Sequence, residues 1–170
     1  MYGCFPRAAD ALFNTVDARL PETHTHSFPE LSLSPFFERR WGSLYEAFED
    51  GRIDQNRLRG VFARVSAAAK RGGTLLLDID ARSHERPQSK TSPDSTVVYK
   101  ANLPESSKPI SSGWQFSTVV LLPGQLSSWT AMLEKQRIRS DQTSVEVAAI
   151  QLCELAPLLR CHPIVATDRW

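Results

Sequence analysis

The chain has 170 residues, of which 41% are hydrophobic, and its 20 basic and 19 acidic side chains give a formal net charge of +1. This composition allows a packed core but excludes an overall charge of the kind that binds nucleic acid, so any DNA-binding surface must be local. No apolar run reaches the roughly 18 residues of a membrane span, the N-terminus lacks a signal-peptide pattern, and the three widely spaced cysteines favour a reducing cytoplasm over a disulfide scaffold.

The first part of the chain is predicted to be helical. Leu12, Val16 and Leu20 recur every four residues, which indicates one face of a helix, and Pro21 ends that helix. A polar connection with His24-x-His26 follows. This spacing could bind a metal, but no third ligand is evident, and a solvated loop is the favoured interpretation.

Two further helices are predicted before residue 73. One contains Leu44, Tyr45 and Phe48 and closes at Asp50–Gly51. Asp54 is a suitable N-cap for the other. The side chains expected on the buried side of that helix are Leu58, Val61, Phe62 and Val65.

The pattern changes to that of strands after residue 73. Leu75–Asp80 is a short apolar run that ends in acids and follows glycines, which predicts a buried strand. Residues 83–112 are rich in Ser, Pro and Lys and are expected to form a long loop, with a short strand at Val97–Tyr99.

The last part of the chain is expected to contain a hairpin, a helix and a strand. Strands at Trp114–Leu122 and Ser127–Leu133 flank a turn at Pro123–Gly124. Ser140 or Asp141 can cap the helix. Pro157 should kink this helix or end it. The side chains expected on one face of that helix are Val145, Ala149, Leu152, Ala156 and Leu159. Pro163–Asp168 is a second short apolar strand ending in an acid. The fold class is therefore α/β, with a helical region at 1–72 and a sheet domain at 73–170.

Two acids follow predicted core strands. Asp80 and Asp168 each end a short apolar run. Parallel neighbouring strands place their carboxyl ends at the same edge of a sheet, so the two carboxylates converge if these strands are adjacent. Carboxylate oxygens are the ligands that Mg²⁺ prefers. Asp78 points the same way as Asp80 and could be the ligand instead, although the strand-end position favours Asp80.

Five segments in order resemble bacterial insertion-sequence transposases with a DDE endonuclease domain. Asp78 and Asp80, with Arg86–Pro87 shortly after, resemble the strand that bears the first catalytic acid. The other four matching segments are Arg40–Asp54, Gly113–Ser117, Ser127–Ala131 and Thr167–Trp170. The resemblance covers nearly the whole chain.

The resemblance implies a ribonuclease-H-like core with the order strand, strand, strand, helix, strand. It implies that Asp80 is the first acid and Asp168 the second, that the cofactor is Mg²⁺ or Mn²⁺, and that insertion-sequence ends are the DNA partner, with homo-oligomerisation left open. The location it implies is the bacterial cytoplasm, at the nucleoid. The family's third acid lies well beyond its second, and the chain ends two residues after Asp168. We therefore expect an incomplete core and an inactive, truncated product.

Basic residues are also candidates for function. Arg39, Arg40, Arg52 and Arg57 make the helical region locally basic and could contact DNA phosphates, with a solvated helix surface as an equal alternative. His84–Arg86 follows Asp80 and could line the site or contact phosphate, with a plain loop as the favoured interpretation.

Two other functions remain open from the sequence. One is a phosphatase of the haloacid-dehalogenase type, with Asp78 as nucleophile and Asp80 as acid/base. Arg82 stands where that family has Thr or Val, and no convincing downstream motif follows. The other is a non-catalytic DNA-binding regulator.

Overall fold

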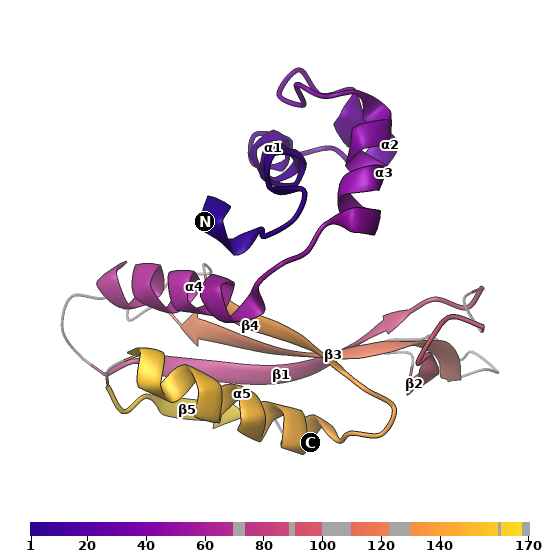
Figure 1. Cartoon of the computed structure of the whole chain (residues 1–170). Helices are drawn as coiled ribbons and strands as arrows, with labels where there is room; N and C mark the ends of the chain where they lie inside the picture. The colour runs from indigo at the N-terminus through magenta and orange to yellow at the C-terminus, as the bar shows by residue number, and fades with distance from the viewer. Residues whose placement is uncertain (70–73, 89–90, 100–109, 123–129, 160, 168–170) are drawn as a thin grey trace. The chain divides into compact units, whose positions relative to one another are not determined.

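A computed structural model describes the whole chain except residues 70–73, 89–90, 100–109, 123–129, 160 and 168–170, and the side chains of 67–69 and 99 (Figure 1). Its contacts divide the chain into two compact units, Met1–Val61 and Phe62–Trp170. The expected domain boundary at residues 72 and 73 falls outside the described residues and stays a prediction. Among the described helices, none is both long and apolar enough to cross a bilayer.

The first unit is helical, as predicted. Its elements are a 3₁₀ turn η1 (Tyr2–Cys4) and helices α1 (Ala9–Arg19), α2 (Phe28–Ser32) and α3 (Trp41–Asp50), followed by α4 (Gln55–Ala69), which continues into the second unit. Two small core clusters stabilise it. They comprise Ala18, Leu31, Phe37 and Leu44 in one case and Phe5, Leu12 and Ala47 in the other.

The predicted face of α1 is correct for two of its three residues. Leu12 is buried and Val16 packs against its cluster, whereas Leu20 lies after the last helical residue and is 77% exposed. The buried surface of the helix also includes Thr15 and Ala18, which the four-residue spacing did not indicate.

Helix α2 was not predicted. The Ser27 hydroxyl accepts a hydrogen bond from the Glu30 amide at 3.3 Å, and the Glu30 carboxylate accepts one from the His26 amide at 2.7 Å. With Pro29 in the first turn, this is the reciprocal arrangement of a capping box. The Ser-x-x-Glu spacing was therefore an available signal in the segment that was expected to be only a polar connection.

Helices α3 and α4 match their predictions in position. Asp54 caps α4 by accepting a hydrogen bond from the Arg57 amide at 3.0 Å. The prediction of its buried side was wrong for Val65, which is 65% exposed, whereas Ala63 is fully buried. The buried residues Arg59, Ala63 and Ser66 each follow a predicted residue by one position, so the buried row of α4 runs about one residue out of phase with the predicted row.

The second unit is a mixed five-stranded sheet with helices on one face. Its elements are β1 (Leu76–Glu85), β2 (Thr96–Tyr99), β3 (Ile110–Leu122), β4 (Ala131–Ile138), α5 (Ser144–Leu159) and β5 (Ile164–Thr167). The strand order is β2-β3-β1-β5, with β4 also paired to β3. β3 pairs antiparallel with β1, β2 and β4, whereas β5 pairs parallel with β1. The predicted α/β class and strand-strand-strand-helix-strand order are confirmed.

Two strands differ from their predicted extents. β1 continues to Glu85, so residues 83–85 belong to the strand and not to the long loop, and β3 begins at Ile110 and pairs with this extension. β4 occupies Ala131–Ile138 in place of the predicted Ser127–Leu133. The hairpin pairing of β3 with β4 is confirmed, and the predicted turn at Pro123–Gly124 lies outside the described residues.

Helix α5 begins later than predicted. Thr143 and Glu146 form its capping box, in which the Glu146 carboxylate accepts from the Thr143 amide at 2.8 Å and the Thr143 hydroxyl accepts from the Glu146 amide at 3.3 Å. The expected caps Ser140 and Asp141 were wrong. Pro157 lies inside the last turn of the helix, which ends two residues later, as a proline near a helix end permits.

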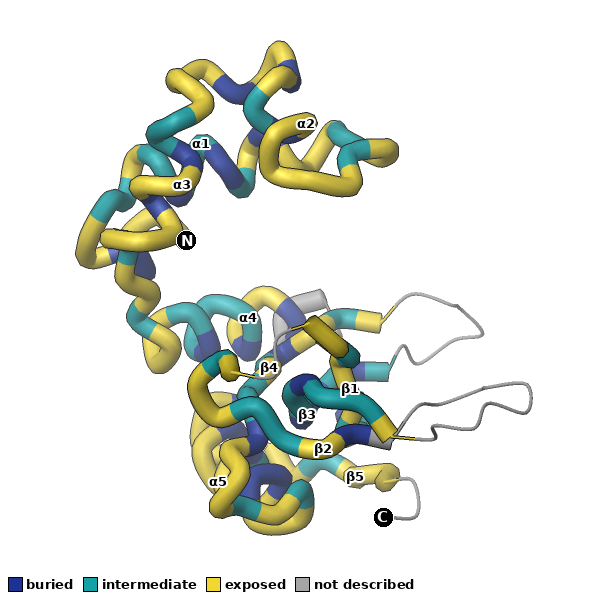
Figure 2. The backbone as a smooth tube through the Cα atoms, turned by 90° about the vertical axis from the view of Figure 1, so that its right-hand side faces the viewer, coloured by how far each residue is buried: buried dark blue, intermediate teal, exposed yellow. Residues whose placement is uncertain are grey.

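One core cluster joins the sheet to both helices. It contains Leu77 and Ile79 of β1 and Val119 and Leu121 of β3 together with Ala63 of α4 and residues of α5. The α5 side chains in it are Ala148, Leu155 and Leu159. α5 runs along the sheet (Figure 1), and Figure 2 shows the buried residues of β1, β3 and α5 gathered between them. Both helices therefore cover the same face of the sheet.

Candidate metal centre

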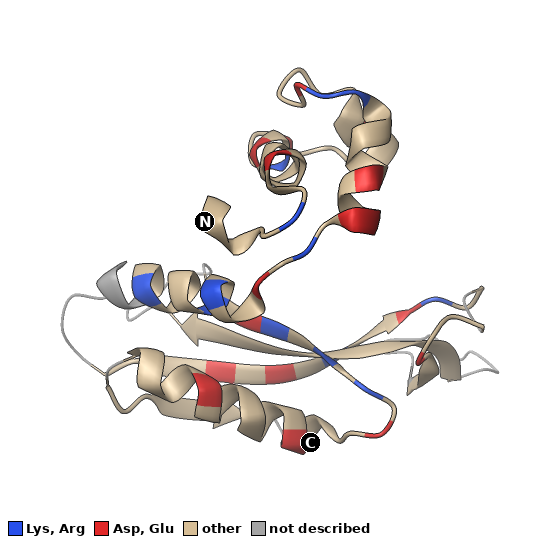
Figure 3. Cartoon of the chain, in the orientation of Figure 1, with Lys and Arg blue, Asp and Glu red and all other residues tan. Residues whose placement is uncertain are grey.

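Asp78 and Asp80 lie on the face of the sheet opposite the core. Leu77 and Ile79 are fully buried, and the two acids that alternate with them are half-buried. Figure 3 shows these acidic positions along β1. The prediction that both acids point the same way is thus confirmed, and strand geometry places them about 7 Å apart along β1.

The parallel neighbour of β1 is β5, which ends in the sequence at the second predicted acid. The described ladder runs from Leu76 opposite Ile164 to Ile79 opposite Thr167. The expected adjacency of the two strands is therefore confirmed. Asp168, the next residue after Thr167, lies outside the described residues.

Two details of the expected site need correction. Asp80 does not end its strand, because β3 continues to pair with β1 as far as Glu85 after the β5 ladder stops. Asp80 is instead the first residue of β1 beyond the described parallel ladder. In addition, the described residues of β5 are all exposed, so β5 is an edge strand and not the core strand that its apolar sequence suggested.

Among the residues that the structure describes, the carboxylate of Asp80 forms one ion pair. Arg82, two residues along the same face of β1, places its Nε 3.3 Å from Asp80 Oδ2. The side chains of Arg82 and Asp80 are 83% and 47% exposed. Solvent screening makes such a pair weak, so a cation can replace Arg82 at little cost.

The residues present fit a divalent ion as part of its ligand set. Asp78 and Asp80 supply the hard oxygen donors that Mg²⁺ and Mn²⁺ take, on one accessible face. Within the described part of the chain, no group of three or more His, Cys, Asp or Glu residues is close enough to hold a metal. A third donor would have to come from outside these residues.

A cluster of basic and aromatic side chains occupies the same face as Asp80. We call this the open face, since α4 and α5 both pack on the other one. The Lys135 Nζ of β4 lies 3.4 Å from His84 Nε2 and 4.9 Å from the centre of the Phe116 ring. His84 also meets the edge of that ring, with ring centres 5.1 Å apart.

The surroundings of His84 favour its neutral form. Burial lowers the pKa of His84, and the charges of Lys135, Arg86 and Arg82 lower it further. Sequence reasoning placed His84 near the site, but it missed Lys135 because the predicted strand stopped at Leu133. The two-residue spacing of Lys135 and Arg137, which places both on one face of a strand, was the available signal.

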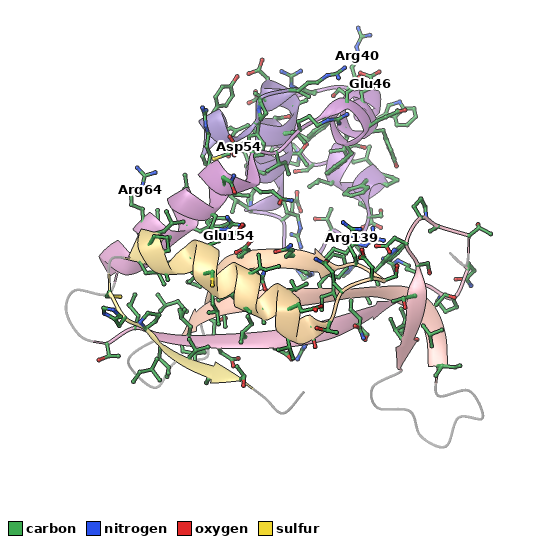
Figure 4. All side chains as sticks on the ribbon, turned by 60° about the horizontal axis from the view of Figure 1, so that its bottom comes forward. Arg40, Glu46, Asp54, Arg64, Arg139 and Glu154 are labelled. Atoms are coloured by element: carbon green, nitrogen blue, oxygen red, sulfur yellow. The ribbon has the colours of Figure 1, made fainter. Side chains whose placement is uncertain are left out.

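The four arginines proposed as DNA contacts lie in the first unit, and three of them have partners there. Arg39 pairs with Asp10 at 3.8 Å and Arg57 with Asp54 at 3.2 Å, and Arg52 donates to the Gly51 carbonyl at 2.7 Å. Arg40 is exposed at the start of α3 and extends away from the helix (Figure 4). Arg40 is therefore the most accessible of the four for a ligand.

Comparison with known proteins gives one match. A family model described as DDE superfamily endonuclease matches residues 1–158, which include Asp78 and Asp80 and end before β5. Curated proteins and solved structures gave no match.

Proposed function

The chain belongs to the DDE superfamily endonuclease family, and on that premise we propose that Asp80 and Asp168 hold a divalent metal ion for cleavage and strand transfer of DNA at insertion-sequence ends. Membership supports a transposase-like nuclease function, and the helices followed by a mixed five-stranded sheet are consistent with a ribonuclease-H-like fold. The ion is Mg²⁺ or Mn²⁺, with Asp78 as a further ligand on the same strand.

The parallel ladder between β1 and β5 carries this proposal. Its last described pair is Ile79 with Thr167, and the next residue in each strand is an aspartate, Asp80 in one and Asp168 in the other. If the register continues by one residue, the two carboxylates face each other across neighbouring strands, which lie about 4.8 Å apart. This separation suits a shared ion.

The chemistry follows from charge. A bound divalent ion supplies Lewis-acid stabilisation of a phosphodiester and of the oxygen that attacks it. With the ion bound, Asp80 would hold it in place of the weak pairing with Arg82. Arg82, whose side chain is exposed, would then be available to neutralise a non-bridging phosphate oxygen.

The helical first unit is proposed to contact DNA outside this centre. Arg40 has the exposure for a phosphate contact, whereas Arg39, Arg52 and Arg57 would first exchange their partners in the chain. Such contacts depend on salt and carry little sequence information.

Calorimetric titration of the full chain with Mn²⁺ tests the metal centre without requiring activity. Asp80→Asn and Asp168→Asn should each weaken Mn²⁺ binding by about tenfold or more, as loss of a ligand does. Asp141→Asn is the matched control, since Asp141 lies in the same unit and pairs with Arg139. Unchanged Mn²⁺ affinity in either variant would remove the proposed centre.

The same variants separate the nuclease from the phosphatase. Nicking of DNA that carries the element's ends should fall in Asp80→Asn and Asp168→Asn. Hydrolysis of a generic phosphomonoester that is abolished by Asp78→Asn, and retained in Asp168→Asn, would favour the phosphatase instead.

A further inference from the structure

The cluster of His84, Phe116 and Lys135 on the open face has unbalanced positive charge. Among the described residues, no carboxylate forms an ion pair with Lys135. The other two cations that the described strands carry on this face are already engaged, since Arg82 pairs with Asp80 at 3.3 Å and Arg137 pairs with Asp94 at 2.8 Å. Of these strand residues, Lys135 is therefore the cation that is available to an anion from solution, and Arg86, just beyond the end of β1, adds positive charge near His84.

The neighbours of Lys135 fix its position. Its ammonium group lies over the Phe116 ring, and the edge of that ring meets His84, so that three strands each contribute one member of the cluster. A cation held over an aromatic ring loses less freedom when it binds a ligand. Lys135 presents the N–H donors of an ammonium group, and the neutral His84 ring adds one N–H donor, whose position is set by the tautomer.

The sheet register sets the separation of this cluster from the candidate metal centre. Asp80 is opposite Thr118 on β3, and Thr118 is opposite Lys135 on β4. Two strand spacings amount to about 10 Å. Phosphates of one DNA strand advance about 3.4 Å along the helix axis per nucleotide and are further apart than this in space, because the strand also winds around the axis; the distance therefore corresponds to about one or two nucleotides.

We propose that Lys135 and His84 bind a phosphate of the DNA strand about one or two nucleotides from the phosphate held at Asp80. This inference rests on the proposed nuclease function for its choice of DNA. The cluster would anchor the strand on the open face, so Lys135 is a positioning residue whose effect is on DNA affinity.

Equilibrium binding to a duplex oligonucleotide at several salt concentrations, without divalent metal, tests the contact. Lys135→Gln should weaken binding about two- to fivefold at low salt. It should also reduce the slope of log affinity against log salt by about 0.9. Arg139→Gln is the matched control, because Arg139 (Figure 4) is a nearby cation of the same unit that pairs with Asp141. An unchanged slope in Lys135→Gln, or an equal change in Arg139→Gln, would overturn the inference.

Neutral methylphosphonate linkages locate the contact. One placed about one or two nucleotides from the cleaved position should weaken binding to the wild-type chain and have no effect on Lys135→Gln. Equal sensitivity of both proteins at that position would contradict the assignment. Displacement of DNA by sub-millimolar inorganic phosphate through Lys135 would show a site for free phosphate and overturn the DNA assignment. These results do not depend on cleavage, so failure here leaves the metal proposal standing.

Discussion

Ser117 of β3 and Gln151 of α5 form a reciprocal pair of hydrogen bonds in the core. The Ser117 hydroxyl donates to Gln151 Oε1 at 2.6 Å, and Gln151 Nε2 donates to the Ser117 carbonyl at 3.4 Å. Both side chains are fully buried. Because polar groups in such a place require partners, the pair fixes the position of α5 against the sheet that carries Asp80.

Removal of one partner should cost more than removal of both. Ser117→Ala leaves Gln151 Oε1 without its hydrogen-bond donor and should lower the free energy of unfolding by about 1–3 kcal/mol. In the double variant Ser117→Ala/Gln151→Leu, much of this loss should be recovered. Urea denaturation measures both, with Ser83→Ala at an exposed strand position as control. A double variant that loses the sum of the two single effects would contradict the pairing.

Gly113 permits close approach of β3 to β1. A Cβ at this position would collide with the backbone carbonyl of His84. Gly113→Ala should therefore destabilise the protein by about 1–3 kcal/mol or more, because backbone must move. Gly60→Ala, in α4 with open space around the position, should stabilise by about 0.5–1 kcal/mol. Thermal unfolding that shifts in the same direction for both variants would count against this interpretation.

Asp94 anchors the segment before β2 to the end of β4. Its Oδ2 accepts from Arg137 at 2.8 Å and its Oδ1 from the Ser140 amide at 3.0 Å. Hydrogen bonds from the Ser140 hydroxyl and amide lower the pKa of Asp94, Arg137 and Arg139 add to this effect, and burial opposes it. The folded state thus favours the ionised carboxylate.

This lowered pKa predicts a direction for the dependence of stability on pH. The contribution of Asp94 is fully present above the unfolded-state pKa of about 3.9 and is lost as the pH falls through the lower folded-state value. Asp94→Asn should therefore be less stable than wild type at neutral pH, with a difference that shrinks below about pH 4. Urea midpoints across this range provide the measurement, with Asp141→Asn as control. A difference that does not change with pH would exclude the ionised anchor.

The start of α5 gives a direct comparison between two candidate caps. Thr143→Ala removes the observed cap and should cost about 1 kcal/mol. Asp141→Ala, at a position favoured by the sequence alone, should cost less than about 0.5 kcal/mol, since Asp141 has only an exposed ion pair. The reverse order in chemical denaturation would restore the original prediction.

The sequence predicted the elements that have strong local signals. The apolar runs before Asp80 and Asp168 identified β1 and β5, and Asp54 identified the start of α4. The extension of β1 through Ser83 and His84 was missed, because pairing with β3 and not residue preference makes these polar residues a strand. Which apolar residues are buried was harder to predict than where the strands lie. The apolar residues of β5 are exposed because its free edge and faces have no cover among the described residues.

The candidate site was predictable only where it depends on local sequence. Alternation along β1 is a local property and gave the shared direction of Asp78 and Asp80. The cluster of His84, Phe116 and Lys135 is assembled from three strands by their register, which a single sequence does not display. A bulge near Val119 and Val120 also changes the register of β4 against β3.

Iron-directed cleavage of the protein tests the shared metal ion most directly. Fe²⁺ bound in place of Mg²⁺, with ascorbate and peroxide, should cut the chain both next to Asp80 and next to Asp168. Excess Mg²⁺ and either Asp→Asn substitution should suppress both cuts together. Cleavage beside only one of these residues, or cuts that persist in excess Mg²⁺, would contradict a site shared by the two strands.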